Sequence, residues 1–174
     1  GDSKHDVRFD WEFSTVVCAG LLLTTGKWYF EITTKRWSYG QQFGFLDIEF
    51  VPGKDKMDTS AHAWSVDRTS FVHSGNSHKQ DADDSFRPFP DFGGTMGCAC
   101  DIDNRTISFV TASMKRDGKA IDIEASVAFT GVQCSGGLIP AISAYYGDFT
   151  INLGENDFKL CPRLQGGYRP LQDA

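Results

Sequence analysis

The chain has little that would attract a polyanion and no segment suited to a membrane. Its 174 residues carry 17 Lys and Arg against 23 Asp and Glu, a formal net charge of -6, so no basic field is available for a phosphate backbone. We therefore expect no nucleic-acid partner, whereas a cationic peptide suits this charge. The longest apolar stretch, 16–23, is too short to cross a bilayer and lacks the basic flank of a signal peptide. We expect no membrane contact from this domain.

The cysteines are few and form no evident framework. There are five, an odd number, and no two have the Cys-x-x-Cys spacing, which disfavours both a complete set of disulfides and a structural zinc site. Cys98 and Cys100 stand two apart in a strand-like segment and face one side, where we favour small core residues over a redox pair. Reduced thiols and the lack of a signal peptide predict an intracellular, cytoplasmic location.

Catalytic and metal-binding motifs are also lacking. The sequence has no Gly-x-Ser-x-Gly elbow, no phosphate-binding Gly-x-x-x-x-Gly-Lys loop and no His-Glu-x-x-His motif. The four histidines have no metal-binding spacing. The acidic run Asp81-Ala82-Asp83-Asp84 lacks the glycine turn and terminal Glu of an EF-hand, so we favour a solvated face over a calcium site. We expect no enzyme activity, no metal and no cofactor.

What the sequence does contain is a series of short strand patterns. In 28–34, Trp28, Phe30 and Ile32 alternate with residues that point to the other face, which is typical of a half-buried strand. Similar patterns predict strands at 43–50, 63–67, 96–102, 106–110, 139–144 and 149–153. Turn formers separate these segments, and no segment keeps a helical period for long. The sequence therefore predicts an all-β, two-sheet antiparallel β-sandwich with little helix.

The remaining segments set the expected domain organisation. Residues 74–92 are polar and predict a long surface loop, and 115–125 predict a second polar insertion. We expect an N-terminal extension or flanking strand at 1–19, the sandwich itself at 20–162, and a C-terminal tail at 163–174 that packs on it as irregular chain.

The order of these segments resembles the SPRY domain family. The matching motifs are Gly26-Lys27 with Tyr29-Phe30-Glu31-Ile32, Phe43-Gly44-Phe45, Trp64-Ser65-Val66-Asp67, His73-Ser74-Gly75, Gly97-Cys98 with Asp101, Thr106-Ile107-Ser108-Phe109, Leu138 with Pro140-Ala141 and Ser143, and Asn152 with Gly154. Several motifs in one order are more specific than any one of them alone. The resemblance spans 20–162 and implies a concanavalin-like sandwich.

Two loops depart from the family pattern, and the tail adds a short further likeness. Gly93-Gly94-Thr95 stands where the family has Gly-Asp, and a longer insertion replaces the Asn-Gly hairpin that follows Phe109. These departures concern loop shape rather than fold. The segment 164–171 resembles the chain that follows SPRY domains in very large scaffolds such as ryanodine receptors.

The resemblance implies a non-catalytic module that binds a protein or short peptide, is monomeric in isolation, and belongs to a larger protein such as a ubiquitin ligase or a channel scaffold. In relatives that capture peptides, three loops build the pocket. The corresponding residues here are Arg36, Trp37, Ser38 and Tyr39, then Phe71, Val72 and His73, then Tyr145, Tyr146 and Gly147. Each loop contains an aromatic side chain, which offers large rigid contact area at low entropy cost.

Other interpretations stay open at this point. Phe71 and one of the two adjacent tyrosines would instead fill the sandwich, because neighbours on a strand face opposite sides. His73 would then be a hydrogen-bonded structural residue. A lectin-like module, with Trp37, Tyr39 and Tyr146 stacked on sugar rings, is the main alternative function. A domain packed permanently against its neighbours is another, and a large exposed apolar patch away from the loops would favour it.

Overall fold

The computed structural model describes residues 5–36, 38–67, 70–78, 94–114, 121–160 and 166–174. The strands are β1 (Asp6–Val17), β2 (Lys27–Thr34), β3 (Gln42–Leu46), β4 (Ala63–Val66), β5 (Phe71–His73), β6 (Asn76–His78), β7 (Thr95–Asp101), β8 (Thr106–Met114), β9 (Ile121–Thr130), β10 (Ile139–Asn152) and β11 (Arg169–Pro170). A short 3-10 helix, η2 (Leu171–Asp173), lies at the C-terminal end of the described residues. The all-β prediction is confirmed.

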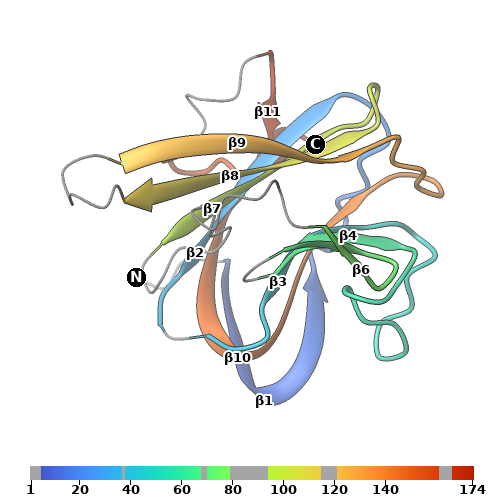
Figure 1. The fold of residues 1–174 in the computed structure, drawn as a ribbon. Helices are drawn as coiled ribbons and strands as arrows, with labels where there is room; N and C mark the ends of the chain where they lie inside the picture. The colour runs from blue at the N-terminus through green and yellow to red at the C-terminus, as the bar shows by residue number, and fades with distance from the viewer. Residues whose placement is uncertain (1–4, 37, 68–69, 79–93, 115–120, 161–165) are drawn as a thin grey trace.

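The strands form one hydrogen-bonded sheet that curls into two facing layers (Figure 1). Its order is β6-β5-β4-β3-β10-β2-β7-β8-β9, while β1 pairs with β10 and the short β11 runs parallel to β2. The long strand β10 joins the layers, because residues 139–143 pair with β3 and residues 149–152 pair with β2. The expected two-sheet sandwich is therefore present, with β10 shared between its sheets.

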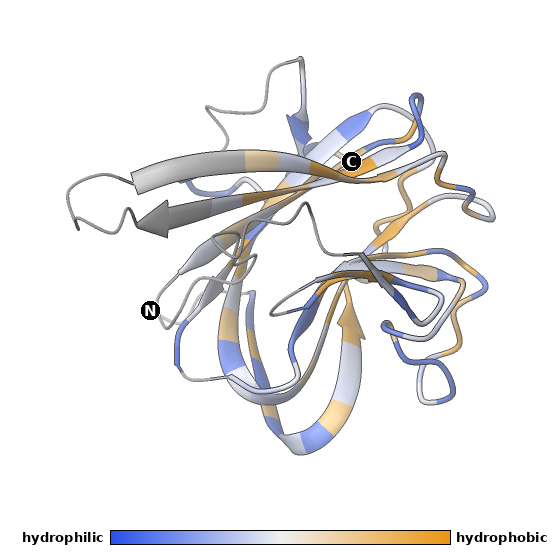
Figure 2. Cartoon of the chain, in the orientation of Figure 1, coloured by the Kyte–Doolittle hydropathy of each residue, from blue (hydrophilic) through white to orange (hydrophobic). Residues whose placement is uncertain are grey.

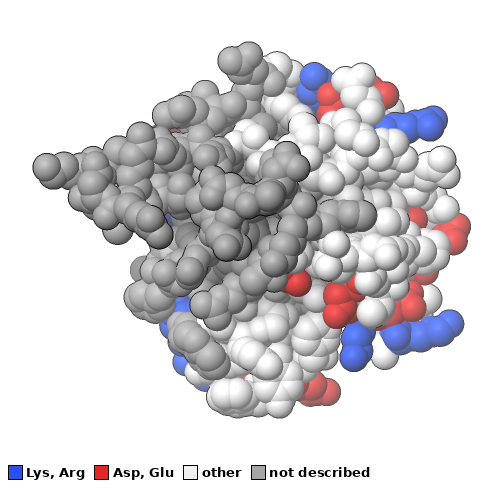
Figure 3. All heavy atoms as spheres, in the orientation of Figure 1, with Lys and Arg blue, Asp and Glu red and all other residues white. Residues whose placement is uncertain are grey.

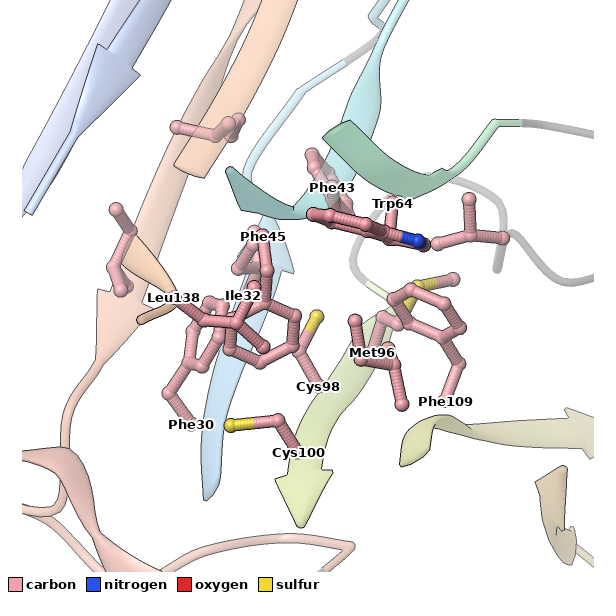
Figure 4. Close-up of a cluster of buried hydrophobic side chains, with 14 of the residues drawn as sticks. Phe30, Ile32, Phe43, Phe45, Trp64, Met96, Cys98, Cys100, Phe109 and Leu138 are labelled. Atoms are coloured by element: carbon pink, nitrogen blue, oxygen red, sulfur yellow. The ribbon is translucent and has the colours of Figure 1, made fainter. Parts of the chain in front are cut away.

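Apolar side chains from both layers fill the interior (Figure 4). β2 and β7 contribute side chains that face those of β3 and β4, as their period-2 alternation requires. The labelled residues of this core are Phe30, Ile32, Phe43, Phe45, Trp64, Met96, Cys98, Cys100, Phe109 and Leu138. Both cysteines are 0% exposed, and burial raises the pKa of each thiol. They are core residues, as predicted.

The other face of β2 is covered by the segment that follows β10. Tyr29 packs edge-on against Phe158, with ring centroids 4.8 Å apart. The carboxylate of Glu31, only 2% exposed, accepts hydrogen bonds from the Tyr29 hydroxyl (2.9 Å) and from the backbone N–H groups of Lys159 (2.9 Å) and Leu160 (2.6 Å). This part of the sheet is therefore buried on both faces.

Several boundaries differ from the sequence-based prediction. The strand predicted at 43–50 ends at Leu46, because Asp47 accepts a hydrogen bond from the backbone N–H of Glu49 and starts a turn. The segments predicted separately at 139–144 and 149–153 form one strand, β10. The prediction broke this strand at its aromatic-glycine segment, which the structure carries through as strand.

The predicted insertions and ends also contain strands. Residues 121–125 of the second insertion belong to β9, and residues 76–78 of the predicted long loop form β6. Residues 79–92 of that loop lie outside the described residues. The N-terminal segment is a strand, β1, paired along β10, and Figure 2 shows hydrophobic and hydrophilic residues alternating along these two strands. Within the described ranges, no helix has the length and apolar character that a bilayer span requires.

Candidate functional site

The middle of β10 lies in the gap between β2 and β3, where the loop after β2 takes the place of a paired strand. The backbone N–H of Lys35 donates to the carbonyl of Asp148 (2.8 Å), and that of Tyr39 donates to the carbonyl of Tyr146 (2.9 Å). In return, the carbonyl of Tyr39 accepts the N–H of Tyr145 (3.0 Å). Two of the three predicted site segments are thus brought together by backbone hydrogen bonds.

Four aromatic side chains meet over this segment. Tyr39 is 60% exposed and lies edge-on to Tyr145, with centroids 6.0 Å apart. Trp11 of β1 is 57% exposed, stacks on Tyr146 at 4.4 Å and meets Tyr145 edge-on at 5.7 Å. Both adjacent tyrosines are half-buried, so neither fills the core. We call Trp11, Tyr39, Tyr145 and Tyr146 the aromatic surface.

Trp11 was not among the predicted site residues, and a bulge in β1 places it there. The register of β1 on β10 shifts between Asp10 and Ser14, so three residues of β1 stand opposite one residue of β10. Trp11 lies within this bulge and has a φ of 60°. Regular alternation would direct it inward beside Phe9, which is 2% exposed, but the bulge directs it outward.

Charged side chains border the aromatic surface. The Arg36 guanidinium lies over the Tyr146 ring, 4.7 Å from its centroid, and its Nε is 2.8 Å from a carboxylate oxygen of Asp148. The Nε of Arg8 is 3.9 Å from the other oxygen of that carboxylate. Asp10 stands opposite Tyr146 in the ladder and, within the described residues, forms no ion pair. Acidic and basic side chains also lie side by side on the face shown in Figure 3.

Gly147 allows the loop after β2 to lie directly on β10. Its φ is +146°, and a Cβ at this position would lie 2.8 Å from the Cβ of Ser38 and 2.9 Å from the ring of Phe149. Any side chain would force the loop or the core ring to shift. Trp37, predicted to lie in the same loop, falls outside the described residues.

The third predicted segment, β5, is not brought to the aromatic surface. β4 and β3 separate it from β10. Phe71 is 3% exposed and stacks on Phe109 in the core, and Val72 is 5% exposed. The Nδ1 of His73 lies 2.8 Å from the carbonyl oxygen of Ala63, which it can only approach as a donor. These three side chains pack or form hydrogen bonds within the sandwich and do not contribute to the aromatic surface.

A separate cavity of about 520 Å³ lies at the opposite end of β2, near Asp101, Arg105 and Cys134. Burial acts to raise the pKa of Asp101, but hydrogen bonds from Asn104 and Lys27 outweigh it and hold that pKa below its ordinary value. Across the described part of the chain, no three His, Cys, Asp or Glu side chains gather as a metal site requires.

One comparison with known proteins identifies the family, and another supports the fold. A family model of the SPRY domain matches residues 27–156. Among 193 matching chains of solved structures is the crystal structure of the SPRY domain of human HERC1, with a TM-score of 0.64 and 17% sequence identity, covering 90% of this chain and 92% of that chain. A search of curated proteins gave no significant match. The structural match at this identity establishes the fold, and the family model spans most of the chain. The chain therefore belongs to the SPRY domain family.

Proposed function

We propose that this domain is a non-catalytic module that binds a peptide or a protein surface through the aromatic surface. SPRY domains are generally protein-interaction modules within larger proteins, and this class of function is the starting point. The observation that carries the proposal is the convergence of four aromatic side chains from β1, the loop after β2, and β10. In the parent protein, the domain would recruit a partner or substrate to a larger assembly such as a ubiquitin ligase or a channel scaffold.

The exposed rings are large enough to supply useful affinity. Trp11 and Tyr39 are 57% and 60% exposed. An aromatic side chain buries 150–250 Å², so a partner that covers the exposed part removes roughly 100 Å² per ring from water. At ~25 cal/mol per Å² this contributes about 2.5 kcal/mol for each ring. The backbone of Tyr39 is hydrogen-bonded to β10, and Trp11 lies between Asp10 and Ser14, which both pair with β10, so little ordering entropy opposes the gain.

Selection from a random linear peptide library displayed on phage tests the proposal. The native domain would be compared with a Tyr39→Ala, Tyr145→Ala variant whose thermal transition shows that it is folded. A Val127→Ala variant is the matched control, because this apolar side chain is 59% exposed and lies outside the aromatic surface. We expect the native and control proteins to enrich a shared motif and the tyrosine variant to enrich none.

The other outcomes separate the alternatives. Equal enrichment by native and tyrosine variant would move the site away from the aromatic surface. Absence of any enriched peptide would overturn the proposed function. Binding to immobilised glycans that the tyrosine variant loses would instead identify a lectin-like module, since exposed Trp and Tyr rings also stack on sugars.

A second candidate function, packing against a neighbouring domain, is favoured by one observation. Leu22, Ile48 and Val51 are 48%, 56% and 47% exposed. Leu22 and Ile48 lie against Gly137 and Gly136, beside the cavity at the far end of the sandwich. Enriched peptides that are lost in a Leu22→Ser, Ile48→Ser variant, rather than in the tyrosine variant, would assign the interface to this end.

A further inference from the structure

The backbone of Trp11 is strained. A positive φ is uncommon outside glycine and is a genuine outlier for a bulky side chain, whereas Gly, Asn or Asp tolerates it. The bulge is pinned on both sides, because Asp10 and Ser14 pair with residues of β10. The result of this strain is a Trp ring on the outer face that stacks on Tyr146 and stays 57% exposed. Strained residues cluster at ligand-binding positions.

The two residues that flank Trp11 are exposed acids. Asp10 lies opposite Tyr146 in the ladder, and Cβ atoms of such pairs are about 5 Å apart, so its carboxylate is next to the aromatic surface. Within the described part of the chain, neither Asp10 nor Glu12 forms an ion pair or a side-chain hydrogen bond. Among the described residues of β1 and the loop after β2, the cations are Arg8, Lys35 and Arg36; Lys35 pairs with Asp6, and both arginines are directed to Asp148. Two carboxylates are therefore left uncompensated beside an exposed indole.

The chain itself shows which group suits such a ring. The guanidinium of Arg169 lies 4.1 Å from the centroid of Trp28, and that of Arg36 lies 4.7 Å from the centroid of Tyr146. Trp is the strongest of the aromatic side chains for a cation over its face, and adjacent carboxylates add to the attraction. Trp11, whose flanking charges are both negative, has the features of another such site, and no cation of the described residues lies over its ring.

We infer that the peptide bound under the proposed function carries a Lys or Arg whose cationic group lies over Trp11, between Asp10 and Glu12. This inference rests on the proposed function and adds to it the charge of the partner and the two carboxylates that receive it. The formal net charge of -6 acts in the same direction, since it favours the approach of a basic segment.

The test uses peptides selected by the native domain, labelled for fluorescence anisotropy. We expect them to be enriched in Lys and Arg, and we expect Trp11→Ala to raise Kd about tenfold. The variant Asp10→Asn, Glu12→Gln is expected to raise Kd about fivefold and to flatten its dependence on salt. The matched control Asp157→Asn, Asp173→Asn changes net charge equally at exposed acids elsewhere, and should leave Kd within about twofold.

Each failure is distinguishable. Selected peptides without Lys or Arg, or a Kd that both site variants leave unchanged, would overturn this inference while the Tyr39→Ala, Tyr145→Ala result still supports the proposed function. No selected peptide at all would overturn the proposed function and this inference with it. If Trp11→Ala releases β1 and fails to fold, the acid variant decides alone, because both carboxylates are exposed and support no core contact.

Discussion

Replacement of Glu31 by Gln is expected to lower the free energy of unfolding by about 2 kcal/mol. The carboxylate is buried and accepts three hydrogen bonds, from Tyr29 and Leu160 at Oε1 and from Lys159 at Oε2. The Gln oxygen can accept the first two, but its NH2 group then faces the N–H of Lys159, donor against donor. Loss of a hydrogen bond to a charged acceptor costs ~1.5–3 kcal/mol, and removal of a buried charge offsets part of this.

Urea denaturation of the native and Glu31→Gln proteins measures the effect. The slope of the transition should stay unchanged while its midpoint falls. For a chain of this size, the same change lowers Tm by about 4–8 °C. Hydrogen exchange should show faster opening at the amides of Lys159 and Leu160 than at those of β7, because these two amides depend directly on the carboxylate. Glu12→Gln, at an exposed glutamate, is the control and should change stability by less than about 0.5 kcal/mol.

Two results would refute this reasoning. Unchanged stability in Glu31→Gln would mean that relief of the buried charge equals the lost hydrogen bond, so the carboxylate would not anchor the segment over β2. A Glu31→Ala variant no less stable than Glu31→Gln would exclude any role for the three donors, since Ala leaves all of them without this acceptor and should cost about 4 kcal/mol.

Two further predictions concern the frame of the site and a loop histidine. Gly147→Ala should destabilise the domain by about 3 kcal/mol, because its Cβ would meet the Phe149 ring. Gly53→Ala, the control, is also at positive φ but in open space, and should cost about 1 kcal/mol. Equal decreases in the urea midpoints of the two variants would contradict the steric explanation. The hydrogen bond that His62 donates to the Asp47 carboxylate raises the pKa of His62 above its ordinary value of 6.5, so this stabilisation is present below that value and is lost as pH rises through the raised pKa. NMR titration should give the raised pKa of His62, and the urea midpoint should fall as pH rises through that pKa. His62→Gln should remove this pH dependence of stability. A urea midpoint that rises with pH through the pKa of His62 would contradict the prediction.

Strands such as β2 and β7 could be predicted because the sequence pattern that indicates them is local. In β2, alternating large apolar residues such as Phe30 and Ile32 determine which face points into the core between the two layers, and Cys98 and Cys100 show the same rule in β7. Turn-forming residues then indicate where each strand ends. The prediction failed for β10, because its Tyr-Tyr-Gly segment resembles a turn, while the bonds that keep it extended come from β1 and from Tyr39, both distant in sequence.

The aromatic surface could be predicted only in part. Tyr39 and the two tyrosines of β10 were expected together from the family resemblance, but Trp11 was not. A signal for β1 does exist, since Val7, Phe9, Trp11 and Phe13 alternate with polar residues. That same alternation would have directed Trp11 inward, beside Phe9. Only the register of β1 on β10, which depends on pairing across most of the chain, creates the bulge that exposes it.

Binding and folding should be separable at this surface, because different atoms support them. The backbone of Tyr39 is held by β10, and the core beneath the site consists of Phe9 and Phe149, which meet edge-on at 5.9 Å. The exposed rings of Trp11 and Tyr39 add little to that core. A variant that removes an exposed ring should therefore lose affinity with little change in Tm, whereas a variant of Gly147 should lose both. Affinity loss without loss of stability is thus the signature that distinguishes a contact residue from the frame that positions it.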